Sequence, residues 1–233
     1  MGISMINKLL SLLQLCDSNF PSGAFSHSFG LETYIYEQGI HNTITFQAAL
    51  HTYMDIQVTY TDGLACHLAY EYVKEGNIEK LWELDAMLSA LALARETREG
   101  NRRIGERLVK LCSVLYSEFV LLAEYGQRIR KKEAYGHPAI AFALVAYGLE
   151  INQRETIAAY IYSVVQSLIQ NAVRAVPLGQ TDGQKLLLFV QPLIQQAVQK
   201  IEKADAEELG MTSPGLEIAQ MRHEHLPIRL FMS

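Results

Sequence analysis

Three segments of the sequence carry residue types that could do chemistry. Residues 17–32 hold four serines around His27, and a serine beside a histidine is the pair that hydrolases use as nucleophile and base. Residues 176–184 are rich in glycine, as are loops that bind phosphate groups. His223 and His225 flank Glu224 and could bind a borderline divalent ion such as Ni²⁺ or Zn²⁺.

The serine-rich segment lacks the spacing of a hydrolase. A nucleophile elbow needs Gly-x-Ser-x-Gly after a strand, but Ser26 stands where the first glycine before Ser28 would be, and the preceding residues predict a helix. Small residues also suit a loop that passes close to helices, with hydroxyls that cap the helix beginning at Leu31. We therefore predict a packed loop and keep a hydrolase that uses Ser26 or Ser28 with His27 as an alternative hypothesis.

Gly179 and Gly183 do not form a phosphate-binding loop. That motif has four residues between its glycines and continues Gly-Lys-Ser/Thr. Here three residues intervene, Gln184 separates the second glycine from Lys185, and Leu186 stands where a hydroxyl would bind Mg²⁺. The sequence therefore predicts that the chain binds no nucleotide by itself.

The two C-terminal histidines are weak metal candidates. Side chains two positions apart lie on different faces of a helix, so His223 and His225 converge only at an unwound helix end. The three cysteines are widely spaced and form no metal-binding pair. We expect no metal ion or other cofactor to be bound stably.

The composition favours a folded, cytoplasmic protein. The 233 residues are 49% hydrophobic and 19% charged with a net charge of −5, which excludes a disordered chain and argues against a nucleic-acid-binding protein. Scattered cysteines in odd number fit a reducing compartment, and no segment has the pattern of a secretory signal or a membrane span. We expect neither nucleic acid nor a membrane as a partner.

Apolar residues recur at helical spacing through most of the chain, and almost no segment alternates as a half-buried strand does. Asn152, Thr181 and Ser213 have the pattern of helix starts. The sequence therefore predicts an all-α fold, a single-domain multi-helix bundle over residues 1–233 with about eight or nine helices and two packed loops rich in glycine and proline. The expected helices include residues 6–15, 46–74, 78–93, 97–125, 138–149, 156–173 and 185–200.

Two surface segments have more than one interpretation. Arg95, Arg98 and Arg102 recur at helical spacing between glutamates, which fits a solvated, salt-bridged face or a docking surface. Residues 226–233 are mostly apolar and either fold back on the bundle or enter a partner. Because that run is too short to fold alone, we expect it, like residues 1–5, to be flexible without a partner.

Four motifs in order resemble those of one protein family. Residues 15–18 read Leu-Cys-Asp-Ser, and residues 20–32 read Phe-Pro-x-Gly-x-Phe-x-His-Ser-x-Gly-Leu-Glu. Residues 176–184 read Val-Pro-Leu-Gly-Gln-x-Asp-Gly-Gln, and residues 221–233 read Met-x-His-Glu-x-Leu-x-x-Arg-Leu-Phe-x-Ser. With Arg98, Gly105 and His137-Pro138 between them, the chain from Leu13 onward resembles the UreF family of urease accessory proteins. Cys16 and Pro227-Ile228 depart from the usual family pattern, and Pro227 could alter how the last residues lie on a partner.

The resemblance implies an all-α protein without enzymatic turnover. It implies a chaperone that is needed for nickel insertion into apo-urease, that bridges UreD (UreH in some species) and the GTPase UreG, and that modulates GTP hydrolysis. Nickel would then be handled by the complex, GTP would be bound by UreG, and the chain would act as a homodimer. The alternative in a neighbouring class is a different helical adaptor or GTPase regulator with an unrelated partner.

The resemblance also suggests where each partner binds. For the UreD/UreH interface the candidates are His223, Glu224, Leu226, Arg229, Leu230, Phe231 and Ser233. For UreG recruitment they are Phe20, Pro21, His27, Ser28, Glu32, Arg98, Arg174 and Gln180. Tyr160 and Tyr162 place aromatic rings on a mostly apolar helix and serve either self-association or core packing.

Overall fold

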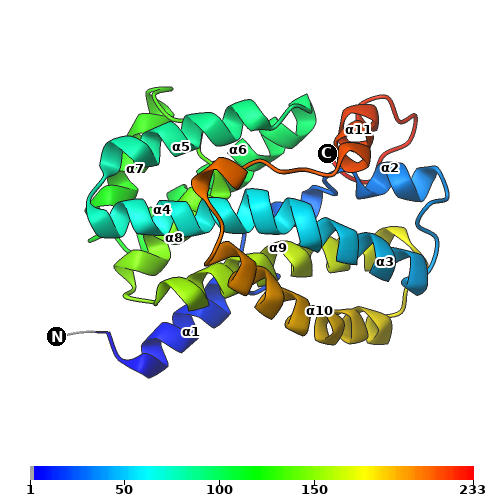
Figure 1. Ribbon diagram of the computed structural model, residues 1–233, viewed down its shortest axis with the longest axis horizontal. Coiled ribbons are helices and arrows are strands. Elements are labelled where there is room, and N and C mark those ends of the chain that lie inside the picture. Colours follow the sequence, from blue (N-terminus) through cyan, green and yellow to red (C-terminus); the bar gives the residue numbers. More distant parts are fainter. Residues whose placement is uncertain (1–2) are drawn as a thin grey trace.

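The computed structural model describes residues 3–233, and within them every regular element is helical, which confirms the all-α prediction (Figure 1). Met1 and Gly2, part of the segment expected to be flexible, lie outside the described residues, and Ser4 caps the first helix by accepting a bond from Asn7 N at 3.2 Å. The α-helices are α1 (Met5–Leu15), α2 (Leu31–Tyr36), α3 (Thr43–Tyr53), α4 (Leu64–Glu75), α5 (Ile78–Leu91), α6 (Arg95–Leu115), α7 (Val120–Arg130), α8 (Pro138–Gly148), α9 (Gln153–Ala175), α10 (Gln180–Ile201) and α11 (Pro214–His223). A π-helical segment, η2 (Met54–Gly63), and two 3₁₀ turns, η1 (Ala24–Ser26) and η3 (Ala206–Glu208), complete the chain.

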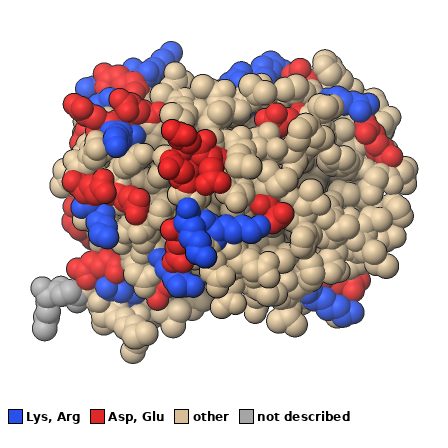
Figure 2. Space-filling model, viewed as in Figure 1, with Lys and Arg blue, Asp and Glu red and all other residues tan. Residues whose placement is uncertain are grey.

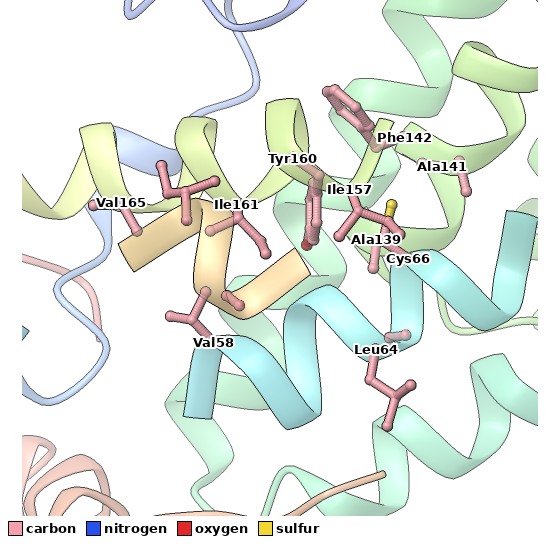
Figure 3. Packing of buried hydrophobic residues seen from close by; sticks show 14 of the residues in the cluster. Val58, Leu64, Cys66, Ala139, Ala141, Phe142, Ile157, Tyr160, Ile161 and Val165 are labelled. Atoms are coloured by element: carbon pink, nitrogen blue, oxygen red, sulfur yellow. The ribbon is translucent and has the colours of Figure 1, made fainter. Parts of the chain in front are cut away.

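Helix α8 lies at the centre of the hydrophobic core. Every residue from Pro138 to Ala146 is buried, and Figure 3 shows side chains from α4 and α9, among them Cys66 and Tyr160, gathered beside it. Small and large residues alternate along α8, so neighbouring helices can approach it on all sides. Helix α9 packs on α8, α10 and η2, and its C-terminal half lies beneath the first loop.

The start of α8 is held by a buried carboxylate from another helix. Asp85 of α5 accepts hydrogen bonds from the backbone N–H groups of Tyr135 at 2.5 Å and His137 at 3.0 Å, and from the hydroxyl of Tyr125 at 2.7 Å. The turn so fixed lies directly against α6, where a Cβ on Gly105 would come within 1.8 Å of the carbonyl oxygen of Gly136. This contact sets the spacing between α6 and the core.

The predicted helix over residues 46–74 is continuous but not α-helical throughout. Residues Met54–Gly63 wind as a π-helix, and the Thr59 hydroxyl donates to the carbonyl of Met54 at 2.6 Å. A Cβ on Gly63 would lie 2.5 Å from the side chain of Ile201, so the segment runs close against α10. Periodicity alone does not reveal the wider turn, because π-helical segments keep an apolar side toward the core.

The predicted helix over residues 97–125 is wrong in its continuity, because α6 ends at Leu115 and α7 starts at Val120. In the break, the rings of Tyr116 and Phe119 stack at 5.2 Å. Phe119 also covers Gly148 of α8, where a Cβ would lie 2.6 Å from the phenyl ring. This aromatic packing changes the direction of the chain, although residues 116–119 contain no glycine or proline from which a turn could be predicted.

Of the three predicted helix starts, one carries the expected capping bond. Asn152 accepts from the N–H of Glu155 at 2.9 Å. Helix α10 begins at Gln180 after Gly179, so the start predicted at Thr181 is wrong. Ser213 does precede Pro214 at the first position of α11, but its hydroxyl makes no capping bond.

Acidic and basic side chains are interspersed over the surface in the view of Figure 2, where the right-hand middle, around α3, carries few of them. No helix in residues 3–233 combines the length and the apolar character that crossing a membrane requires.

Candidate functional site

The first loop, residues 17–30, is folded tightly enough to present its backbone to other segments. Phe29 and Gly30 both have positive φ angles, of 50° and 90°, so the chain reverses just before α2. A Cβ on Gly30 would lie 2.9 Å from the side chain of Gln220 on α11, which makes glycine the residue that this contact tolerates. The reversal points the N–H groups of Ser28 and Phe29 away from the loop.

The C-terminal segment, residues 224–233, lies against this loop. Ser28 N donates to the main-chain oxygen of Ser233 at 2.5 Å, and Phe29 N donates to the same oxygen at 3.1 Å. Met232 N donates in turn to the carbonyl oxygen of Ser26 at 2.8 Å. The loop thus supplies backbone partners for the C-terminal segment that the apolar pattern did not predict. The flexibility of residues 226–233 without a partner stays a prediction.

Side chains of the C-terminal segment alternate between two sides. Phe231 and Ser233 point inward and are only 5% and 2% exposed, and the guanidinium of Arg174 from α9 lies 5.3 Å from the centre of the Phe231 ring. Leu230 and Met232 point outward and are 63% and 48% exposed. An extended backbone gives this two-residue period, so one side anchors the segment and the other is free to contact a partner.

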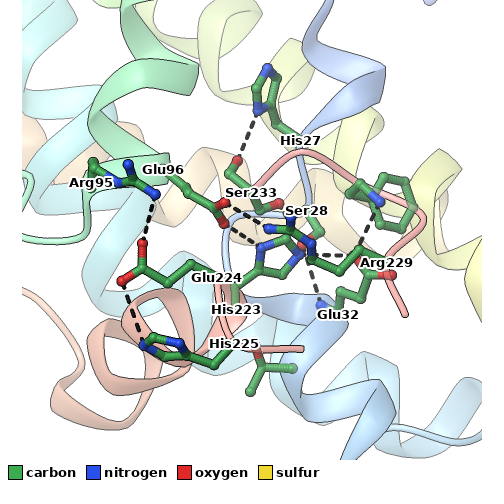
Figure 4. A network of polar contacts seen from close by, with 12 residues as sticks. His27, Ser28, Glu32, Arg95, Glu96, His223, Glu224, His225, Arg229 and Ser233 are labelled. Carbon is green, nitrogen blue, oxygen red and sulfur yellow. Dashed lines mark hydrogen bonds and ion pairs between the residues drawn. The ribbon is translucent and has the colours of Figure 1, made fainter. Parts of the chain in front are cut away.

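A buried histidine joins α11 to α2 and α6 (Figure 4). His223 is fully buried, with Nε2 2.9 Å from Glu32 Oε2 and Nδ1 2.7 Å from Glu96 Oε2. Burial alone would lower the pKa of His223, but the two carboxylates outweigh it and raise that pKa above its ordinary value. Both ring nitrogens are occupied by carboxylates, which leaves neither free to bind a metal ion.

The same two carboxylates hold the C-terminal segment. Glu32 accepts hydrogen bonds from the backbone N–H groups of Leu230 at 2.6 Å and Phe231 at 3.1 Å. Glu96 Oε1 accepts from the guanidinium of Arg229 at 2.7 Å. Burial would raise the pKa of Glu32, but the bonds from the imidazole and from the two N–H groups hold the pKa of that carboxyl below its usual value.

His27 is bonded to Ser233 and to neither serine that the hydrolase hypothesis pairs with it. His27 Nδ1 lies 2.8 Å from Ser233 Oγ, while the Ser28 hydroxyl donates to the main-chain oxygen of Ser233 at 2.7 Å. Burial, reinforced by nearby Arg103 and Arg107, lowers the pKa of His27 to about 4. Its Nε2 atom has no hydrogen-bond partner among residues 3–233, so no carboxylate orients the ring as in a catalytic triad.

The structure brings together residues that we had assigned to two separate interfaces. His27, Ser28 and Glu32, predicted for UreG recruitment, are bonded to His223, Phe231 and Ser233, predicted for the UreD/UreH interface. Arg174 joins them by donating to the carbonyl oxygen of Phe25 at 3.0 Å and by covering Phe231. The two sets form one cluster, which we call the tail cluster. Its members are His27, Ser28, Glu32, Glu96, Asn171, Arg174, His223, Arg229, Leu230, Phe231 and Ser233.

Several predicted residues lie at the edge of the tail cluster or outside it. The Glu224 side chain is partly exposed, and its carboxylate pairs with Arg95 of α6 at 3.1 Å. Leu226 is half-buried and His225 is exposed. Arg98 donates to the carbonyl oxygen of Ala92 at 2.8 Å, at the end of α5. Phe20 is half-buried against the core, Pro21 is exposed, and Gln180 is exposed at the start of α10.

The self-association prediction for Tyr160 conflicts with its position. The ring is 3% exposed and lies 5.3 Å from the ring of Phe142, inside the core that Figure 3 shows. It cannot contact a second copy unless the core opens. Tyr162 is half-buried on the same helix, so its role in self-association stays a prediction.

Sequence reasoning missed Glu96 and Asn171. Glu96 had been assigned only to a row of alternating charges on α6, although it binds both His223 and Arg229. The Asn171 side chain donates to the carbonyl oxygen of His27 at 2.8 Å and so fixes the first loop on α9. A polar residue within an otherwise apolar helical stretch was the available signal for Asn171.

A cavity of about 320 Å³ lies beneath the first loop. His27, Tyr53, Asp62 and Tyr160 are among the residues that line it. Burial raises the pKa of the Asp62 carboxyl to about 7. In residues 3–233 no group of three or more histidine, cysteine or acidic side chains is arranged to hold a metal ion.

Comparison with known proteins gives a consistent result. The sequence model of the UreF family matches residues 40–191. The chain is 54% identical over 228 residues to the "Urease accessory protein UreF" of Bacillus sp. (strain TB-90), covering 98% of this chain and 100% of that protein. The proteins of the same name from Geobacillus kaustophilus and Ureaplasma parvum serovar 3 are 53% and 44% identical, and each alignment covers 97% of this chain and at least 96% of the relative. The chain therefore belongs to the UreF family of urease accessory proteins.

Proposed function

We propose that the chain is a non-catalytic, cytoplasmic chaperone that bridges UreD (or UreH) and the GTPase UreG during nickel insertion into apo-urease and modulates GTP hydrolysis by UreG. The observation that carries this proposal is the tail cluster, in which two motifs 200 residues apart in the chain meet at one surface. A surface formed by both ends of a chain suits an adaptor. A partner that binds one of the two motifs also contacts or displaces the other.

The tail cluster is organised for contact with a protein. Leu230, Met232 and Ile228 are exposed on the same C-terminal segment whose Glu224 and Arg229 form ion pairs with Arg95 and Glu96 of α6. An apolar centre with charged residues at its rim is the usual composition of a protein interface, in which arginine is favoured. The Ser28 hydroxyl, the Ser233 hydroxyl and the His223 ring are each hydrogen-bonded within the cluster, which supports the non-catalytic role that we propose.

The outward side of the C-terminal segment is the surface that we assign to UreD or UreH. The Leu230→Asp variant places a charge at an exposed position and leaves the backbone bond to Glu32 intact. We expect it to lose co-purification with UreD or UreH while its thermal unfolding temperature stays unchanged. Leu188→Asp on α10 is the matched control, because Leu188 is 66% exposed and lies outside the tail cluster. If both variants bind equally well, this surface is not the interface.

A further inference from the structure

In the structure the C-terminal segment lies against the first loop, which we call the closed state of the tail cluster. In this state each ring nitrogen of His223 faces a carboxylate oxygen. The distances from its two ring nitrogens, 2.9 Å to Glu32 and 2.7 Å to Glu96, are both hydrogen-bond lengths. A neutral imidazole carries a single N–H and donates one hydrogen bond, whereas an imidazolium donates two. Without the second proton, a nitrogen lone pair would face a carboxylate oxygen at hydrogen-bond distance, and the two would repel each other.

The charges around His223 come from every element packed against it. Helix α2 supplies Glu32, α6 supplies Glu96, and the C-terminal segment supplies Arg229. A protonated His223 together with Arg229 cancels the two carboxylates, and loss of the proton leaves one negative charge uncompensated in a buried site. The remaining titratable or charged neighbours are the His27 ring on the first loop, Arg222 and Glu224 on and after α11, and Arg95, Glu99 and Arg103 on α6.

Both carboxylates that bind the imidazole also bind the C-terminal segment. Glu32 holds Leu230 and Phe231 through their backbone N–H groups, and Glu96 holds Arg229. If either carboxylate moves away from a neutral imidazole, its hydrogen bond to the C-terminal segment is therefore disturbed as well. The position of the segment is coupled in this way to the protonation of one buried side chain.

We propose that His223 is a proton-operated latch: the C-terminal segment stays closed on the first loop while the imidazole is protonated and opens as the pH rises and the proton leaves. The sign follows from linkage, because a group that binds its proton more tightly in the closed state stabilises that state at low pH and stops doing so once the pH passes the closed-state pKa. Glu32 acts in the opposite direction at acid pH, since it must stay ionised to hold the two N–H groups. The closed state is therefore favoured in a window between the two transitions.

The test is hydrogen exchange by NMR on the isolated full-length chain. The pH is raised from about 6 to about 9, and each measured rate is corrected for intrinsic exchange, which gives a protection factor. We expect protection of the Leu230 and Phe231 amides to fall about threefold or more, along the same curve on which the His223 ring resonances titrate. Amides of α9 in the core serve as the reference for global stability.

Two variants separate the latch from a general effect of pH. His223→Gln removes the titrating group and should make the protection of the two amides low and independent of pH. His225→Gln is the matched control, because the His225 side chain is 79% exposed and lies outside the Glu32–Glu96 pair. The latch is refuted if protection falls with pH equally in His223→Gln, or if the His223 ring of the unaltered chain titrates without any change in protection. The second result needs no variant to fold.

Discussion

Replacing Glu32 by glutamine should release the C-terminal segment while the helical core stays folded. The Glu32 carboxylate accepts from His223 Nε2 and from the N–H groups of Leu230 and Phe231. Glutamine has the same shape, but one of its two terminal atoms is an NH₂ group that donates and cannot accept. At least one buried donor then loses its partner, and the charge that faces the imidazole is gone.

The size of the effect follows from those three contacts. Leaving one buried donor unsatisfied costs about 1–3 kcal/mol, and hydrogen bonds to a charged group contribute about 1.5–3 kcal/mol each. The variant keeps part of this set, so we expect the closed state to lose about 2 kcal/mol, which corresponds to about a 30-fold increase in the population of the open segment. The loss is local, because the backbone hydrogen bonds of residues 230–233 go to the first loop and to the Glu32 side chain.

Hydrogen exchange followed by mass spectrometry on the peptide that spans residues 226–233 measures this opening directly. Glu37→Gln is the matched control: Glu37 lies just after the same helix and pairs with Arg222 of α11 at 2.8 Å, but the two side chains are 37% and 60% exposed. An exposed ion pair contributes between about 0 and 1 kcal/mol, so exchange in the control should stay near that of the unaltered chain. Equal exchange in the unaltered chain and in Glu32→Gln would refute the role that we give to Glu32.

Two further substitutions test the core and the cavity. Gly105→Ala places a Cβ within 1.8 Å of the Gly136 carbonyl oxygen, so overpacking should lower the free energy of unfolding by about 1–3 kcal/mol in urea titrations, whereas Gly179→Ala, which meets no atom closer than 3.7 Å, should leave it nearly unchanged. Asp62→Asn should raise the thermal unfolding temperature more at about pH 8 than at about pH 4, because burial raises the pKa of Asp62 from 3.8 to about 7 and the cost of burying this carboxyl grows as the pH rises between those two values; an equal gain at both pH values would contradict this.

The helical content could be predicted from the sequence because buried faces repeat at helical spacing. Helix α8 is the clearest case, since its apolar residues and His137-Pro138 start define it without any tertiary information. The end of α6 could not be predicted in this way, because stacking of Tyr116 on Phe119 and the contact of Phe119 with Gly148 decide it. The contact of Phe119 with Gly148 joins residues that are distant in sequence, so local periodicity carries no trace of it.

Most residues of the candidate site could be predicted from the sequence, but their arrangement in space could not. The motifs that contain Glu32 and His223 could be found as separate segments, but their ion pair joins positions 191 residues apart. Glu96 fitted a solvated charged face equally well, since a glutamate in a charge-rich helix has the same sequence signature whether it meets water or a buried imidazole. Only the packing of α11 between α2 and α6 distinguishes the two.

The proposed chaperone role is tested most directly by urease activation in cells that express the urease structural and accessory genes. The chain is present, absent, cut after Met221, or present as Leu230→Asp, and both enzyme activity and nickel bound per urease are measured. We expect absence, truncation and Leu230→Asp each to leave soluble urease that is poor in nickel and inactive, while Leu188→Asp supports full activation. Nickel loading and activity that survive the absence of the chain would contradict the proposed function.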